Sequence, residues 1–227
     1  MFTKYFTMYN IDQLNGKVIW LFRHRRSGST WFNETLKKVI KRQGLLIKPV
    51  TKKENYLSDY SIDFNNRSEE PKDKEIILST HHFVILEEMH RWTNPILICV
   101  NRKDNTENFI SDFIFKKVTG IANLQNTSEL ILFPNIEPLC IPIRFAEMYV
   151  EEKKYNEKLW NEHSNKYESE MVYYEDLLTG WDSKLLNIHL SMKNNTKSDI
   201  PKLPYDKKKI VINYDEIDRF LKDAFSQ

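Results

Sequence analysis

The sequence is poor in cysteine, which excludes a small protein held together by disulfide bonds. Its 227 residues include two cysteines, Cys99 and Cys140. Cys99 lies within an apolar run, as a small core residue would. Cysteine usage of this kind is typical of a reducing compartment. No His and Cys residues cluster at the spacing of metal ligands, so the sequence predicts no metal site.

The chain also lacks long hydrophobic runs. No stretch approaches the roughly 18 consecutive apolar residues that indicate a transmembrane helix. Residues 1–15 contain no basic segment followed by an apolar one, so no signal peptide is predicted. We therefore expect a cytoplasmic protein without an integral membrane segment.

A large charge of one sign is absent as well. The 34 Lys and Arg residues nearly balance the 32 Asp and Glu residues, and the formal net charge is +2. This balance argues against a general nucleic-acid binder. Any anion site must be local, and the basic cluster Arg23–Arg26 is the first candidate.

The order of apolar runs predicts an α/β fold. The chain is long enough for one full hydrophobic core. Strands are expected at 18–22, 75–80, 96–100 and 171–174, and helices at 31–43, 83–92, 105–118, 141–165 and 215–225. Such alternation favours a three-layer sandwich, in which helices flank a central, mainly parallel β-sheet. No linker-like composition divides the chain, so we expect a single domain over residues 1–227.

The longest expected helix, 141–165, carries an apolar stripe. Ile141, Phe145, Met148, Tyr155 and Leu159 follow the spacing of one helical face. We expect this stripe to face the core.

The most informative motif is the loop Arg25–Trp31, which reads Arg-Arg-Ser-Gly-Ser-Thr-Trp between an expected strand and an expected helix. This geometry directs backbone N–H groups and a helix N-terminus toward one anion. Arg26 and the neighbouring hydroxyl groups suit phosphate oxygens. The nucleotide motif GxxxxGK[ST] is absent, so the loop favours a 5′-phosphate group that needs no metal.

Two further candidates follow strands. His81 comes after an apolar run, at the sheet edge where open α/β folds bind ligands. A neutral imidazole there could remove a proton from a hydroxyl group. Arg102 follows the next strand, and its fork suits a phosphate, with Ser111 nine residues later. The alternative for Arg102 is a surface ion pair with Asp104 or Glu107.

The order of these segments resembles the sulfotransferases that use 3′-phosphoadenosine-5′-phosphosulfate (PAPS). The loop is similar to their 5′-phosphosulfate loop, Thr80-His81 to their strand-end Thr-His, and Arg102…Ser111 to their Arg…Ser pair. Tyr174-Glu175-Asp176-Leu177 is similar to a later family segment. The resemblance covers residues 17–177 and implies a P-loop-NTPase-like fold.

The resemblance also implies an activity and its residues. PAPS would donate a sulfuryl group in line to a hydroxyl or amine acceptor, leaving 3′-phosphoadenosine-5′-phosphate (PAP). The implied catalytic residues are His81 as the base, Glu34 as its alternative, and Arg26 in place of the family lysine. The implied cofactor-binding residues are Arg25, Arg26, Ser27, Gly28, Ser29, Thr30, Trp31, Arg102, Ser111 and Tyr174.

The sequence departs from the family at two places. Ser79 stands where the family has a strand-end lysine, and the late Arg-Lys-Gly segment has no clear counterpart. We interpret the basic run Lys207–Lys209 as a solvated surface. Two other functions stay open: a kinase-like phosphotransferase, and a non-catalytic domain that binds nucleotides or sulfated ligands. The acceptor, a small molecule or a carbohydrate, and the oligomeric state are not indicated.

Overall fold

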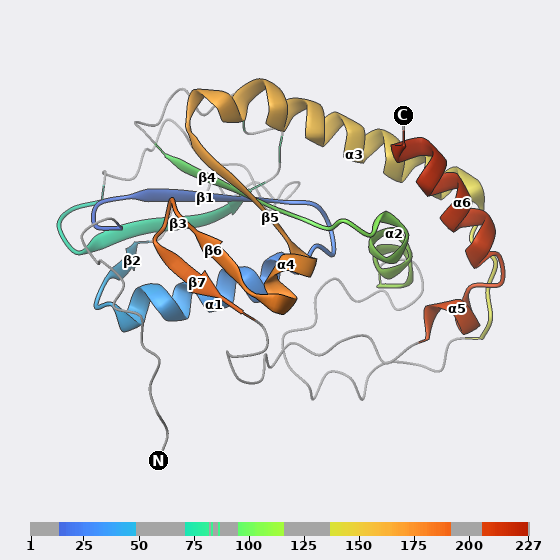
Figure 1. Ribbon diagram of the computed structural model, residues 1–227, viewed down its shortest axis with the longest axis horizontal. Helices are drawn as coiled ribbons and strands as arrows, with labels where there is room; N and C mark the ends of the chain where they lie inside the picture. Colours follow the sequence, from blue (N-terminus) through green and yellow to red (C-terminus); the bar gives the residue numbers. More distant parts are fainter. Residues whose placement is uncertain are drawn as a thin grey trace, which may run out of the picture.

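The computed structural model describes residues 14–48, 71–81, 83, 86, 95–115, 137–191 and 206–226. Its centre is an all-parallel sheet (Figure 1). The strands are β1 (Val18–Arg23), β2 (Leu46–Lys48), β3 (Glu75–His81), β4 (Ile96–Asn101) and β5 (Glu168–Tyr173). Their order in the sheet is β2-β3-β1-β4-β5. Helices flank this sheet, which confirms the predicted α/β fold.

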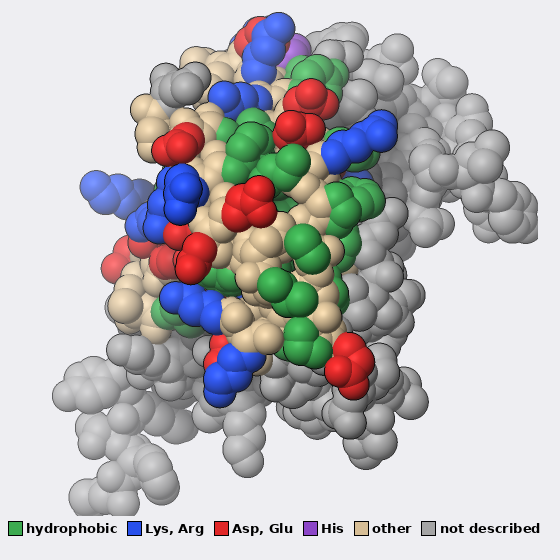
Figure 2. Space-filling view, turned by 90° about the vertical axis from the view of Figure 1, so that its right-hand side faces the viewer, with side chains coloured by type: hydrophobic (Ala, Val, Ile, Leu, Met, Phe, Trp, Pro, Cys, Tyr) green, Lys and Arg blue, Asp and Glu red, His purple; other side chains and the backbone are tan. Residues whose placement is uncertain are grey.

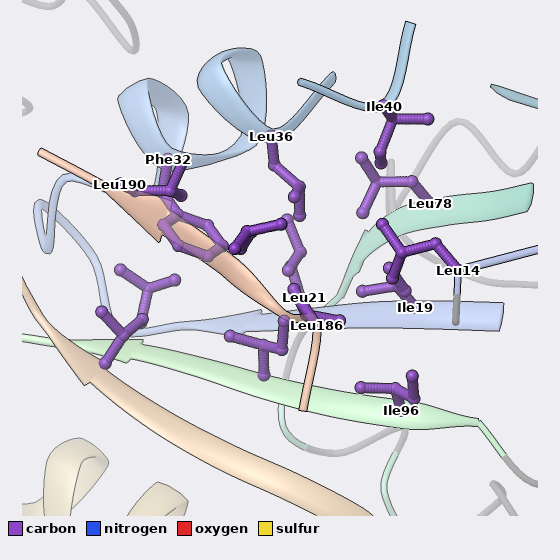
Figure 3. Close-up of a cluster of buried hydrophobic side chains, with 14 of the residues drawn as sticks. Leu14, Ile19, Leu21, Phe32, Leu36, Ile40, Leu78, Ile96, Leu186 and Leu190 are labelled. Atoms are coloured by element: carbon purple, nitrogen blue, oxygen red, sulfur yellow. The ribbon is translucent and has the colours of Figure 1, made fainter. Parts of the chain in front are cut away.

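The central strand β1 is buried on both faces because its two sets of alternating side chains meet different helices. Ile19 and Leu21 belong to a cluster with Phe32 and Leu36 of α1 (Ser29–Arg42), as Figure 3 shows. Trp20 belongs to a second cluster, to which α3 (Ile143–His163) contributes. The sheet therefore lies between α1 on one face and α3 on the other.

The predicted apolar stripe of α3 is wrong at Met148 and Tyr155, whose exposed fractions are 54% and 51%. The helix instead buries Ala146, Val150 and Lys153. At about 100° per residue, Met148 and Tyr155 lie nearly opposite Ala146 on the helix. The inward face is therefore the one that carries Ala146 and the polar Lys153.

Several short elements were not predicted. A two-stranded antiparallel hairpin joins β6 (Trp181–Ser183) and β7 (Ile188–Leu190). Strand β5 ends one residue before the predicted limit, so Tyr174 begins the short helix α4 (Tyr174–Thr179). The basic run Lys207–Lys209 lies in a further short helix, α5 (Lys207–Ile210). Most of the predicted helix 83–92 lies outside the described residues.

A third hydrophobic cluster joins α2 (Asn105–Phe113), α3 and α6 (Tyr214–Phe225) beside the sheet (Figure 1). On this side of the molecule, hydrophobic side chains lie among acidic and basic ones at the surface (Figure 2). Helix α2 follows β4 directly, so this cluster places α2 at the carboxyl edge of the sheet. None of the described helices is both long enough and apolar enough to cross a membrane.

Candidate anion-binding site at the carboxyl edge of the sheet

The strand order reverses between β1 and β4. From β1 the chain runs outward to β2 and β3, and then crosses to β4 and β5 on the other side. Such a reversal opens the carboxyl edge to ligands in α/β sheets. The backbone N–H of His24 donates to Val100 O at 3.3 Å, which holds the loop after β1 against β4. The predicted loop and Arg102 therefore meet at one edge.

Two residues of the loop have left-handed backbones. The φ angles of Arg26 and Gly28 are 56° and 79°, and Gly28 caps α1. Backbone turns of this kind expose N–H groups on one concave side, where anions bind. Between them, the Ser27 side chain is fully buried, and its Oγ has no hydrogen-bond partner among the described residues. A buried hydroxyl group without a partner costs about 1–3 kcal/mol, so Ser27 suits contact with a ligand oxygen.

The ring of Tyr174 joins the loop to Arg102. A Cβ atom on Gly28 would lie 2.5 Å from Tyr174 Cδ2, so the ring packs directly on this glycine. The guanidinium carbon of Arg102 lies 4.9 Å from the centroid of the same ring, a cation–π distance. One aromatic side chain thus contacts both candidate phosphate-binding segments.

Two carboxylates bracket Arg102, whose side chain is 17% exposed. Its Nε lies 3.6 Å from Glu175 Oε1, and its Nη2 lies 3.9 Å from Glu107 Oε2. The second of these pairs was the predicted alternative to a ligand contact. Glu175 also accepts hydrogen bonds from the backbone N–H groups of Lys103, at 3.0 Å, and Asp104, at 3.4 Å. Helix α4 therefore holds the turn that carries Arg102.

Lys207 extends this charged group. Its Nζ donates to Glu107 Oε2 at 2.5 Å, and Tyr214 OH donates to Oε1 at 3.3 Å. Burial alone would raise the pKa of Glu107, but the bond from Lys207 and the charge of Arg102 lower it overall. The interpretation of Lys207–Lys209 as a solvated run is therefore wrong for Lys207, which is 13% exposed, and holds for the exposed Lys209.

Arg26 points toward α2. Its guanidinium carbon lies 3.8 Å from the centroid of the Phe115 ring. Burial lowers the pKa of Arg26, whereas the charge of Asp112 raises it, and a guanidinium with so high an intrinsic pKa stays charged. Arg26 Nε has no hydrogen-bond partner within the described part of the chain.

One face of α2 is polar and continues beyond the end of the helix to Phe115. Asn108 and Ser111 precede Phe115 on this face at helical spacing, and both are buried. Neither amide atom of Asn108 has a hydrogen-bond partner among residues that the structure describes. Asn108 was not predicted as a site residue, although the stripe Asn108, Ser111, Asp112 and Phe115 opposite an apolar face is visible in the sequence.

His24 is part of the basic cluster but carries no positive charge at neutral pH. It is 4% exposed, and its ring lies 4.8 Å from the Phe83 ring. Burial, with help from the charge of Lys153, lowers its pKa to about 3. The local positive charge therefore comes from arginines and lysines.

The remaining predicted residues are less central. Trp31 is buried in the core cluster around α1, and the exposed Arg25 pairs with Glu152 at 3.2 Å. Glu34 is exposed and bonded to Lys37 at 2.9 Å. His81 is the last residue of β3, and its side chain lies outside the described atoms.

Ser29 and Thr30 begin α1 next to the loop, Ser29 buried and Thr30 partly exposed. Both hydroxyl groups therefore sit in the first turn of a helix, where N–H groups attract anions.

Within the described ranges, no group of three His, Cys, Asp or Glu side chains could hold a metal ion. Comparisons with models of protein families, with curated proteins and with solved structures find no match.

Proposed function

We propose that this protein is a sulfotransferase that uses PAPS and a hydroxyl-bearing acceptor, and that it works in the cytoplasm. The observation that carries the proposal is the packing of Tyr174 against both Gly28 and Arg102. It brings the loop suited to a 5′-phosphate beside an arginine suited to a 3′-phosphate. PAPS and PAP carry both groups on one small nucleotide.

The 5′ end of the nucleotide would lie at the loop. The backbone N–H groups of residues 26–30 and the hydroxyl groups of Ser27, Ser29 and Thr30 would hold the phosphate oxygens. The buried, unpartnered Ser27 Oγ supports this fit. Arg26 would stabilise negative charge on the departing 5′-phosphate. PAPS would supply the activated sulfuryl group. In this proposal the loop and its side chains bind the 5′-phosphate without a metal ion.

The 3′-phosphate would lie near the start of α2. Arg102 offers a charged fork, and Lys207 adds a second cation that already shares Glu107 with it. Ser111 is buried on the same helix, and Asn108 lies one turn closer to Arg102 with an amide group to donate. Tyr174 is placed for contact with the adenine, whereas Trp31 has little free surface left.

The acceptor must lose a proton as its oxygen forms a bond to sulfur and the bond from sulfur to the 5′-phosphate breaks. His81 ends β3 at the same carboxyl edge and is our proposed base. Glu34 is the alternative, but its carboxylate is exposed and already paired with Lys37.

The test is calorimetric titration with PAP in the absence of metal, compared with AMP, which lacks the 3′-phosphate. We expect PAP to bind more tightly than AMP. Arg102→Ala should weaken PAP binding by about 1.5–3 kcal/mol, the range of a charge-assisted contact, and leave AMP binding unchanged. Arg42→Ala, an exposed arginine at the end of α1, is the control and should change neither affinity.

Equal affinities for PAP and AMP in the wild-type protein would contradict the proposal. A preference for ATP with Mg²⁺ would favour the kinase-like alternative instead. Binding of PAP and PAPS without turnover on any hydroxyl acceptor would favour a non-catalytic domain.

A further inference from the structure

A buried lysine lies beside the turn that carries Arg102. Lys153 of α3 is 3% exposed, and α3 runs from its start beside α6 back to the sheet (Figure 1). Its Nζ donates to Arg102 O at 3.3 Å and to Asn105 Oδ1. Lysine is almost never fully buried unless its ammonium group has partners. Lys153 Nζ also lies 5.4 Å from the centroid of the Phe225 ring, but its hydrogen bonds go to the turn that carries Arg102.

Both hydrogen-bond acceptors are uncharged. No carboxylate lies within ion-pair distance of Lys153 in the described part of the chain, and the charges of Glu157 and Glu175 act on it at longer range. Burial lowers the pKa of Lys153. A buried ammonium group costs more than a neutral side chain of equal size, so core packing alone does not account for it.

The turn is held from two sides. On one side, Lys153 donates to oxygen atoms of Arg102 and Asn105 in the turn. On the other side, Glu175 of α4 accepts from the backbone N–H groups of Lys103 and Asp104. Oxygen atoms and N–H groups of one short turn are thus fixed by a cation from α3 and an anion from α4.

We propose that Lys153 is a positioning residue, whose bonds to Arg102 O and Asn105 Oδ1 fix the turn so that Arg102 presents its guanidinium group to a phosphate of the ligand. The proposal rests on the proposed function, because the phosphate is that of the nucleotide. If Lys153 only stabilised the core, its substitution would change the stability of the protein but not its preference for PAP over AMP.

The first experiment measures discrimination between PAP and AMP by calorimetry. Lys153→Met, which keeps the length of the chain without donors, should lower the PAP/AMP affinity ratio about tenfold and leave AMP affinity unchanged. In an Arg102→Ala background the same change should have no further effect, because Lys153 acts through Arg102. Lys154→Met, an exposed neighbour on α3, is the control.

An unchanged ratio in Lys153→Met, or an equal effect with and without Arg102, would overturn the proposal. If Lys153→Met does not fold, Lys153→Gln keeps one hydrogen-bond donor at this position and should lower the ratio by a smaller factor.

The second experiment needs no ligand. Hydrogen exchange of the Lys103 and Asp104 amides should be at least tenfold faster in Lys153→Met than in the wild type, and unchanged in Lys154→Met. If the exchange rates of these two amides are unchanged in Lys153→Met, Lys153 does not fix the turn. If the wild type binds neither PAP nor AMP while this exchange responds as expected, the proposed function fails and the structural part of the inference stands.

Discussion

The contact between Gly28 and Tyr174 can be tested by adding one methyl group. In Gly28→Ala the new Cβ atom would lie 2.5 Å from Tyr174 Cδ2, in a residue whose φ is 79°. The left-handed backbone costs an alanine about 1 kcal/mol. Forcing the ring aside adds about 1–3 kcal/mol, as in other overpacked sites. We therefore expect a loss of about 2–4 kcal/mol in the free energy of unfolding.

Gly44 provides the matched control, because its φ of 78° is nearly the same and, among the described residues beyond its two chain neighbours, no atom lies within 4 Å of its added Cβ. Gly44→Ala should therefore show the backbone cost alone, about 1 kcal/mol. In a Tyr174→Ala background, Gly28→Ala should cost no more than Gly44→Ala, because the ring that it would strike is gone.

Urea unfolding gives these free energies, and calorimetric titration with PAP shows whether the loop still binds its ligand. Gly28→Ala should weaken PAP binding as well, since the ring it displaces also contacts Arg102. Equal losses of stability in Gly28→Ala and Gly44→Ala would refute the packing argument, as would a cost for Gly28→Ala that does not depend on Tyr174.

Three further predictions concern single side chains. Ser27→Ala removes a buried hydroxyl group without a described partner, so urea unfolding should show unchanged or slightly higher stability while PAP titration shows weaker binding. The pKa of His24 is about 3 in the folded protein and about 6.5 in the unfolded chain. Below pH 6.5 the unfolded chain therefore binds a proton that the folded protein does not. The free energy of unfolding should fall by up to about 1.4 kcal/mol per pH unit as the pH decreases from about 6.5 to about 3. His24→Phe should reduce this fall, and an identical pH profile would contradict the argument. Lys207→Met should lower both stability and PAP affinity because it removes the shortest ion pair of the half-buried Glu107 and one cation of the site, whereas Lys209→Met should change neither in the same two assays.

The sheet was largely predictable because its central strands are buried on both faces. Residues 18–22 and 96–100 are continuous apolar runs, and their length is typical of a buried strand rather than of a helix. Strand β2 was missed because it has three residues and Leu46 is 62% exposed. A strand that short leaves no periodicity, and only its pairing with β3 defines it.

The segments of the candidate site were predictable as well, but their side-chain partners were not. Sequence order shows that the loop and Arg102 each follow an expected strand and that Tyr174 ends one, and parallel strands bring such residues to one edge. Which aromatic ring meets the loop depends on tertiary packing. The structure places Tyr174 there and leaves Trp31 in the core, a difference that local spacing does not encode.

The charge of the site also depends on tertiary partners that the sequence does not predict, and it determines how the site could hold an anion. Arg23–Arg26 suggests a strong positive cluster, but His24 is neutral and Arg25 is paired with Glu152. Arg26 lies on Phe115, and two carboxylates bracket Arg102. An incoming phosphate must therefore compete with those carboxylates for Arg102, and the backbone N–H groups of the loop must supply much of the attraction. Salt should accordingly weaken PAP binding less than the number of basic residues would suggest, because fixed backbone dipoles in a partly buried site are screened less than exposed charges.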